Sequence, residues 1–178
     1  YDSEIFLLSS YKKLADIPEL KNFLLNNSQN IDVENLIKMQ LKDFLEEDKL
    51  KKNIKSIKKI KDKISLKVQL QYESNPYPRW TKENIEAYST NTEIIESNYL
   101  TRISNDIFPN ILKNFKKINK ILIAGCGTGR QAIAAAVADP KSDVHAVDIS
   151  KSSISYGIRQ ANELNIKNIK WFHGDILD

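Results

Sequence analysis

The feature that most constrains this chain is a glycine-rich turn directly after a short apolar run. Residues 121–124 read ILIA, and residues 125–129 read GCGTG. A short, continuous apolar run is typical of a strand buried on both faces. Glycines placed directly after such a strand allow a tight turn and let a ligand approach the backbone closely. The Ala-rich residues 130–138 then predict a helix, which the Asp-Pro pair at 139–140 ends.

The strand-then-helix pattern continues to the end of the chain. Residues 144–147 predict a second strand that is closed by Asp148, and Ser150 is expected to cap a helix that runs to about Leu164. Residues 169–172 predict a third strand, closed by a Gly-Asp pair. Strands that alternate with helices in this way form parallel sheets. The sequence therefore predicts an α/β fold, the opening of a doubly wound parallel sheet.

The chain before this region has a different pattern. Apolar residues recur at helical spacing over residues 31–45 and again over 50–70, and residues 1–73 contain no glycine. We expect three parts: an all-α N-terminal domain over residues 1–73, a linker or lid segment over 74–118, and the sheet over 119–178. Short helices are predicted within the linker, near residues 93–106 and 110–115.

The spacing of the glycines separates two classes of ligand. A dinucleotide-binding turn follows the pattern G-x-G-x-x-G/A, which requires Gly or Ala at position 130. Arg130 stands there instead, so the pattern disfavours a nicotinamide oxidoreductase. The third glycine lies at 129, which gives G-x-G-x-G. A compact turn of this kind can contact the ammonium and carboxylate groups of the methionine end of S-adenosylmethionine.

Two acidic residues follow the second and third predicted strands. Asp148 can accept hydrogen bonds from both hydroxyls of a ribose, and Asp175 can accept one from the amine of an adenine that Ile176 would cover. Each acid could instead have a purely structural role, because Asp148 lies beside a helix cap and Asp175 lies in a turn. The glycines could likewise serve packing alone.

Three segments, read together, resemble a known family. ILIAGCGTGRQAIAAA, VHAVDIS and IKWFHGDILD resemble motifs I, post-I and II of class I S-adenosylmethionine-dependent methyltransferases. KVQLQYESNPYPRW, followed by the glycine turn, resembles bacterial methyltransferase-domain proteins that often carry tetratricopeptide repeats. The resemblance implies S-adenosyl-L-methionine as cofactor, an unknown methyl acceptor, and strands 1–3 of a Rossmann-like, seven-stranded class I methyltransferase fold. It implies cofactor contacts at Gly125, Cys126, Gly127, Gly129, Asp148, Ile149, Asp175 and Ile176.

The same resemblance implies that the chain stops after motif II, before the segment that commonly carries the catalytic groups. No catalytic residue is therefore assigned, and this fragment alone is expected to be inactive. The first sheet strand, residues 121–124, would then lie at an open edge, where we expect self-association.

The NPYPRW segment has two interpretations. Tyr77, Arg79 and Trp80 offer aromatic surface and a cation that suit a lid over a substrate or the cofactor carboxylate. Alternatively the segment is a structural clip with Trp80 buried, because two prolines stiffen the backbone equally well for either use.

Composition limits the partners. The net charge is +4, but only four of the 27 basic residues are arginine, which argues against nucleic-acid recognition. No apolar run is long enough to span a bilayer. The single cysteine, Cys126, allows no intrachain disulfide, which fits a reducing, cytoplasmic location. No metal site is predicted.

An alternative to an enzyme is a non-catalytic module that binds a partner through its helical part.

Overall fold

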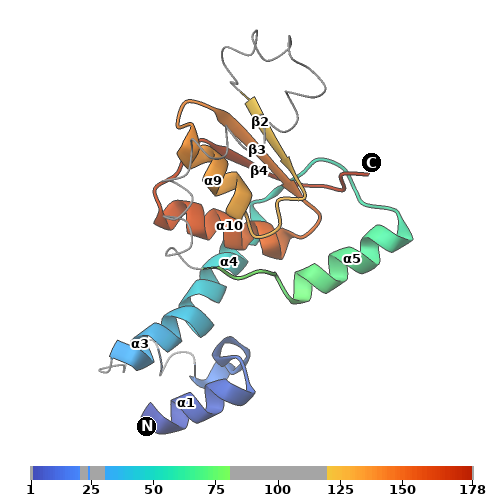
Figure 1. Ribbon diagram of the computed structural model, residues 1–178. Helices are drawn as coiled ribbons and strands as arrows, with labels where there is room; N and C mark the ends of the chain where they lie inside the picture. Colours follow the sequence, from blue (N-terminus) through green and yellow to red (C-terminus); the bar gives the residue numbers. More distant parts are fainter. Residues whose placement is uncertain (1, 21–23, 25–30, 81–119, 178) are drawn as a thin grey trace, which may run out of the picture. The chain divides into compact units, whose positions relative to one another are not determined.

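The computed structural model describes residues 2–20, 24, 31–80 and 120–177 (Figure 1). The chain divides into two compact units, Tyr1–Asn53 and Ile54–Asp178. The boundary thus falls some twenty residues before the expected one at residue 73. The short helices predicted near 93–106 and 110–115 lie outside the described residues, as does most of the linker segment 74–118.

The first unit is helical. Its elements are α1 (Asp2–Tyr11), the 3-10 turn η1 (Leu14–Asp16), α3 (Ile31–Ile37), the π-helical segment η2 (Lys38–Lys42) and α4 (Asp43–Lys52). Elements α3, η2 and α4 follow one another without a break, which confirms the helix predicted over residues 31–45. Its buried apolar residues are Leu14, Leu24, Val33, Ile37 and Leu41.

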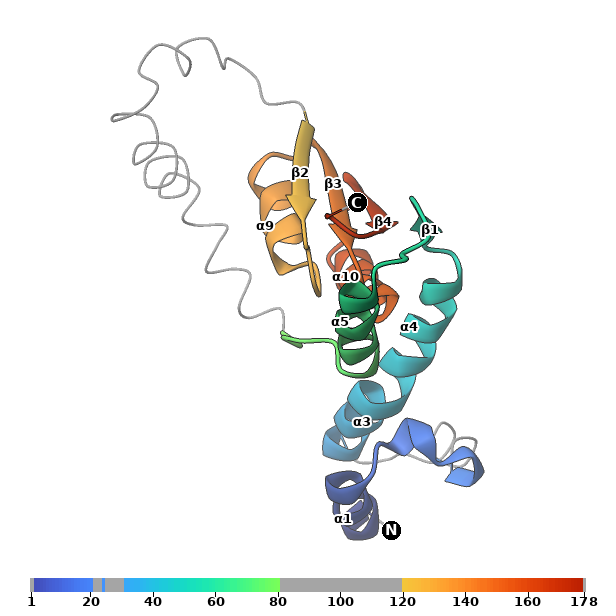
Figure 2. The same cartoon turned by 90° about the vertical axis from the view of Figure 1, so that its right-hand side faces the viewer.

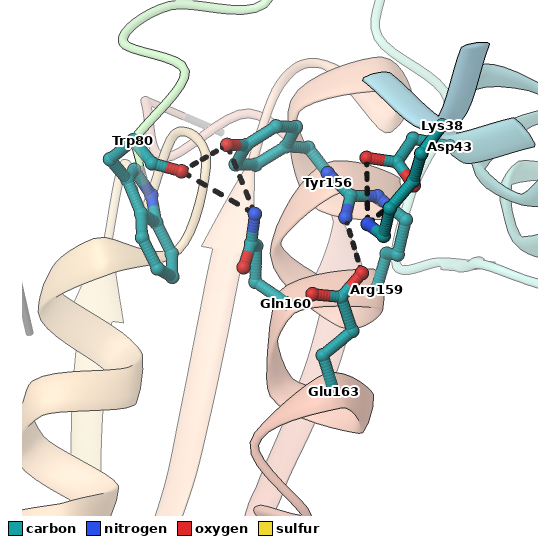
Figure 3. Close-up of polar contacts among 7 residues, drawn as sticks. All are labelled: Lys38, Asp43, Trp80, Tyr156, Arg159, Gln160 and Glu163. Atoms are coloured by element: carbon teal, nitrogen blue, oxygen red, sulfur yellow. Dashed lines mark hydrogen bonds and ion pairs between the residues drawn. The ribbon is translucent and has the colours of Figure 1, made fainter. Parts of the chain in front are cut away.

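An ion pair spans the π-helical segment of this unit. Lys38 Nζ lies 2.9 Å from Asp43 Oδ1 (Figure 3). Half of the Lys38 side chain is exposed, so the pair is screened and contributes little to stability. The apolar contacts named above hold the unit together.

The second unit is built on a parallel sheet of four strands. They are β1 (Lys55–Ser56), β2 (Lys120–Ala124), β3 (Asp143–Asp148) and β4 (Ile169–His173), in the order β1-β4-β3-β2. Ala124 pairs with Val147, and Asp148 with His173, so the carboxyl ends of β2, β3 and β4 meet at one edge. This is the parallel α/β arrangement that the sequence predicted as the opening of a doubly wound sheet, with one additional strand, β1.

Two helices cover one face of the sheet. Helices α9 (Arg130–Ala138) and α10 (Lys151–Glu163) contact each other, and both pack on β3 and β4 (Figure 1). The buried core beneath them comprises Ile54, Cys126, Ala132, Ala136, Val144, Ala146 and Ile154. Small residues on α9 let this helix lie close to the strands.

The helix boundaries follow from local signals in the sequence. Ser150 caps α10, and its hydroxyl accepts from the N–H of Ser153 at 3.1 Å. Gly129 precedes α9 in a left-handed conformation with φ +83°, and the helix ends before Asp139. These boundaries confirm the Ser150 cap and the end of the Ala-rich helix before Asp139 that the sequence predicted.

The prediction of a continuous helix over residues 50–70 is wrong. Helix α4 ends at Lys52, β1 pairs in parallel with β4, and α5 begins only at Lys63 and runs to Ser74. Asp62 caps α5 by accepting from two backbone N–H groups at 2.8 Å. Helix α5 contacts α10 (Figure 2), so residues 54–74 belong to the sheet unit rather than to a helical domain.

Strand β2 occupies one edge of the sheet. Among the described residues it pairs only with β3, and Leu122 is 66% exposed. The self-association expected along this strand remains a prediction. In the part of the chain that the structure describes, no helix combines the length and apolar character needed to cross a membrane.

Candidate functional site

A cavity of about 610 Å³ opens at the carboxyl ends of β2 and β3. Three parts of the second unit form its wall: the glycine turn with the start of α9, the β3–α10 junction, and the end of α5 with the segment that follows it. The lining residues are Tyr72, Tyr77, Pro78, Gly125, Cys126, Gly127, Thr128, Arg130, Gln131, Ala134, Asp148, Ile149 and Ser153. This crevice is where open parallel sheets bind ligands.

The glycine turn adopts a backbone that other residues rarely adopt. Gly125 and Gly127 have φ of +72° and +52°. A Cβ on either would have its nearest neighbour 3.9 Å away, so side-chain crowding does not exclude other residues here. The positive φ angles favour glycine, and the absence of a side chain leaves the backbone open to the cavity.

Asp148 organises this turn. One carboxylate oxygen accepts from the N–H of Gly127 at 2.7 Å, and the other accepts from the N–H of Ser150 at 2.8 Å. Burial raises the pKa of the Asp148 carboxyl, and these backbone N–H groups oppose the rise. The acid therefore joins the glycine turn to the cap of α10, and a carboxylate, with about four lone-pair sites, has acceptor capacity left for a ligand.

Cys126 and His173 are both buried beside Asp148. Burial, with the charge of Asp148, strongly raises the pKa of the Cys126 thiol, which argues against a thiolate nucleophile. His173 lies 2.9 Å from both Ser56 Oγ and Gln69 Nε2. Because an amide nitrogen only donates, the His173 ring accepts at Nε2 and carries its proton on Nδ1. His173 thereby fastens β1 and α5 to β4.

Helix α5 supplies a cap for α10 from outside that helix. One Glu73 oxygen accepts from the N–H of Lys151 at 2.6 Å, and the other accepts from the hydroxyl of Ser152 at 2.6 Å. A carboxylate is favoured at this position because it meets the positive end of the α10 dipole. Tyr72, the preceding residue, lines the cavity.

We expect Glu73→Ala to lower the free energy of unfolding by about 1–2 kcal/mol, because it removes a charged cap from the first turn of α10. Urea denaturation followed by circular dichroism measures this. Gln71→Ala, at an exposed position of the same helix, is the control and should change stability by less than about 0.5 kcal/mol. Equal stability of both variants would contradict the capping role.

The NPYPRW segment is a clip at Trp80 and part of the cavity wall at Tyr77. Trp80 is 3% exposed, and its indole N–H donates to the carbonyl of Thr128 at 3.2 Å. Figure 3 shows the Tyr156 hydroxyl and the Gln160 amide converging on the Trp80 carbonyl, to which both donate. The Thr128 hydroxyl also donates to the Pro78 carbonyl, at 2.6 Å. The segment is thus fixed to the glycine turn and to α10.

Arg79 does not line the cavity. Its guanidinium lies 4.6 Å from the centre of the Tyr156 ring, a cation–π contact. Tyr77 is 75% exposed and stands at the mouth of the cavity. The structure therefore separates the three residues that the sequence grouped as a lid: Trp80 and Arg79 pack on α10, and only Tyr77 faces the cavity.

Of the eight positions expected to contact a cofactor, five line the cavity: Gly125, Cys126, Gly127, Asp148 and Ile149. Ile176 lies next to them, since its Cδ1 is the nearest atom to a Cβ built on Gly125. Gly129 instead packs against Trp171. The Asp175 carboxylate accepts from the N–H of Leu177 at 3.0 Å, and a hydrogen bond from Ser65 is the main cause of its lowered pKa. Asp175 is therefore a turn residue held by α5.

Several residues that line the cavity were not predicted from the sequence as site residues. Arg130, Gln131 and Ala134 occupy one face of the first turns of α9, and helical spacing from the glycine turn could have identified them. Tyr72 gives no such signal, because its place depends on the packing of α5 against α10. Among the described residues, no group of three or more His, Cys, Asp or Glu side chains is arranged to hold a metal ion.

The parallel sheet, with a glycine turn after one strand and an acid at the end of the neighbouring strand, defines part of a Rossmann-like fold. Residues 115–178 match the family described as "Methyltransferase domain". The chain is also 37% identical over 67 residues to the release factor glutamine methyltransferase of Coxiella burnetii (strain RSA 493 / Nine Mile phase I). That alignment covers 36% of this chain and 24% of the relative's length. Over these residues the chain is thus similar to methyltransferases, and its parallel sheet is consistent with part of a Rossmann-like methyltransferase fold.

Proposed function

We propose that this protein transfers a methyl group from S-adenosylmethionine, and that the cavity beside Asp148 binds this cofactor. The observation that carries the proposal is the meeting of the open glycine turn and Asp148 in one cavity, within the segment that matches the methyltransferase family. The named relative matches over a similar length of chain. That match supports the reaction class, and the methyl acceptor stays unassigned.

The residues fit the chemistry of this cofactor. A cavity of about 610 Å³ lies within the range of roughly 300–1,000 Å³ that small-molecule sites occupy. Asp148 offers carboxylate oxygens to ribose hydroxyls, and the N–H groups of the glycine turn are held in place by the same acid. Apolar contact with an adenine ring would come from Ile149 and Ile176.

The role of the described residues would be to bind and orient. S-adenosylmethionine supplies an activated methyl group when bound. Transfer to a good nucleophile is accelerated by fixing the two reactants in line and excluding water. Tyr72 and Tyr77 lie where an aromatic wall could exclude water from the cavity.

Two other functions have less support. A nicotinamide oxidoreductase would need a small residue at position 130, where a helix-initiating arginine lines the cavity instead. A non-catalytic binding module would not require an open cavity beside three glycines of positive φ. Thermal unfolding of the full-length protein separates these: S-adenosylhomocysteine should raise Tm by mass action, and NAD should not.

We expect Asp148→Ala to weaken S-adenosylhomocysteine binding by about 2–3 kcal/mol, roughly 30- to 150-fold in Kd, because a charge-assisted contact to the ribose is lost. Asp148→Asn, of the same size, should show a smaller loss in the same direction. Isothermal titration calorimetry on the full-length protein measures both. Because Asp148 also holds the glycine turn, the unfolding of each ligand-free variant must be followed, and binding measured well below its Tm.

The control is Asp143→Asn. Asp143 begins the strand that Asp148 ends, and it pairs with Lys170 at the surface. This variant should bind with unchanged Kd. An unchanged Kd in both Asp148 variants would refute the cofactor assignment.

A further inference from the structure

Helix α5 has the reverse of the pattern expected for a surface helix, whose apolar side normally packs inward. Its packed side is polar, because Ser65, Gln69 and Glu73 recur every four residues along it. Gln69 Nε2 lies 2.9 Å from Nε2 of His173. Ser65 hydrogen-bonds to the Asp175 carboxylate, and Glu73 caps α10. Polar contacts thus fasten α5 to the second unit.

The apolar side chains of α5 face solvent instead. All five of its large apolar side chains are exposed: Ile64, Leu66, Val68, Leu70 and Tyr72. Ile64 and Leu70, at 73% and 69% exposed, lie on the side of the helix opposite the packed stripe. Contiguous exposed apolar surface that is rimmed by polar residues marks a place where another molecule binds.

Lysines surround these apolar side chains. Residues 55–67 contain six lysines and one acid, Asp62, which is engaged in capping α5. The six are Lys55, Lys58, Lys59, Lys61, Lys63 and Lys67, and all of them are exposed. Lys63 and Lys67 lie on the same outward side of α5 as Ile64. The charge therefore lies beside the apolar side chains rather than on a separate face.

The segment before α5 belongs to the same surface. Ile57 is 61% exposed, and its N–H donates to the His173 carbonyl at 2.9 Å. Ser65, in the first turn of α5, binds Asp175, two residues beyond His173. The segment and the helix are thus anchored at one place, the end of β4. Together the six lysines, Ile57 and the exposed apolar side chains of residues 64–70 form one surface, which we call the α5 surface.

We infer that the α5 surface binds the headgroup region of an anionic lipid bilayer. Lysine ammonium groups are complementary to lipid phosphates, and their aliphatic stems can lie along apolar surface while the charge stays in the headgroup layer. Ile64 and Leu70 would enter the boundary between headgroups and acyl chains, as the apolar side of an interfacial helix does. The inference goes beyond the proposed function and does not depend on the cofactor.

A nucleic acid would use this surface less completely. Residues 55–71 contain no arginine and no aromatic residue, the side chains that pair with phosphates in a fork and stack on bases. A phosphate backbone would neutralise the lysines and leave Ile64 and Leu70 in water. A bilayer satisfies both kinds of side chain at once.

The test is cosedimentation of the full-length protein with vesicles of phosphatidylcholine that contain about one-third phosphatidylglycerol. Vesicles of phosphatidylcholine alone are the comparison. We expect at least about tenfold tighter binding to the anionic vesicles, because each lysine near such a surface contributes about fivefold. Added salt should weaken the binding, since it screens exposed charges. Equal binding to both kinds of vesicle, or to neither, would overturn the inference.

Two double variants separate the charged and apolar contributions. Lys63→Gln with Lys67→Gln should weaken binding to the anionic vesicles by about 10- to 30-fold. Ile64→Gln with Leu70→Gln keeps the charge and should weaken it by about tenfold or more, because the inserted side chains are lost. All four positions are exposed, so both variants should fold, and circular dichroism checks this.

Each variant has a matched control in the same chain. Lys141→Gln with Lys167→Gln removes two exposed lysines outside the α5 surface, and Ile31→Gln with Met39→Gln removes two exposed apolar side chains from the first unit. Both controls should bind within about threefold of the unaltered protein, since they leave the α5 surface intact.

Two results would count against the α5 surface as a membrane site. Losses as large in the controls as in the α5 variants would show that total charge or apolar content, and not this surface, governs binding. Binding of poly(U) RNA that depends on Lys63 and Lys67, without binding to the anionic vesicles, would assign the lysines to a nucleic acid instead.

Discussion

Gly129→Ala is expected to destabilise the protein by about 2–5 kcal/mol, the sum of a left-handed backbone penalty and overpacking. Gly129 has φ +83°, and a Cβ there would lie 2.6 Å from Trp171 Cη2 and 3.0 Å from Gly157 Cα. The indole of Trp171 fills the space between the start of α9 and α10. The neighbouring backbone cannot move without shifting α10. The measurement is the free energy of unfolding in urea.

Gly125→Ala is the matched control for this substitution. Gly125 has a similar φ of +72°, but a Cβ there would have its nearest neighbour at 3.9 Å. It should therefore lose only the backbone penalty, about 1–2 kcal/mol. Trp171→Phe removes the closest of these atoms but leaves Gly157 Cα, so Gly129→Ala should cost at least about 1 kcal/mol less in that background. Equal losses in Gly125→Ala and Gly129→Ala would refute the packing role of Gly129.

Trp80→Ala should cost about 3–5 kcal/mol, as large-to-small changes of a buried tryptophan do. Trp80 packs edge-on against Tyr156, with ring centres 5.9 Å apart, and donates to the Thr128 carbonyl. Its removal leaves a void against α9 and α10 and frees the glycine turn on one side. We therefore expect weaker cofactor binding as well as lower stability, measured by urea denaturation and calorimetry.

Tyr77→Ala provides the comparison within the same segment. Tyr77 is 75% exposed, so its loss should change stability by less than about 0.5 kcal/mol. Trp80→Phe keeps a ring and loses the N–H donor, which should cost about 1 kcal/mol beyond the lost contact area. If Trp80→Ala and Tyr77→Ala were equally stable, the clip described for NPYPRW would be wrong.

The elements around the glycine turn could be predicted from the sequence because their signals are local. The apolar run of β2, the glycine turn before α9, the cap at Ser150 and the acid that ends β3 all depend on residues a few positions apart. Backbone conformation at such positions is set mainly by steric limits and nearby hydrogen bonds. The order of strands and helices then leaves a doubly wound sheet as the arrangement to expect.

Prediction from the sequence failed where segments distant in the chain determine the structure of the same residues. Isoleucines at helical spacing predicted a helix through residues 50–70, yet Ile57 and Ile64 are exposed and Lys55–Ser56 pairs with β4. The edge of β4 offers hydrogen bonds that a helix there would forgo, and His173 secures them through Ser56 and Gln69. Tertiary pairing thus outweighed a periodic pattern.

The site shows the same division. Sequence alone determined the glycine turn and Asp148, because strand ends in a parallel sheet converge whatever surrounds them. Only the tertiary structure decided that Asp175 is held by α5, that Trp80 is a clip, and that Arg79 packs on Tyr156 instead of facing the cavity. Those outcomes depend on α5 and α10 packing together, and no pattern within either helix specifies which side chains then point into the cavity.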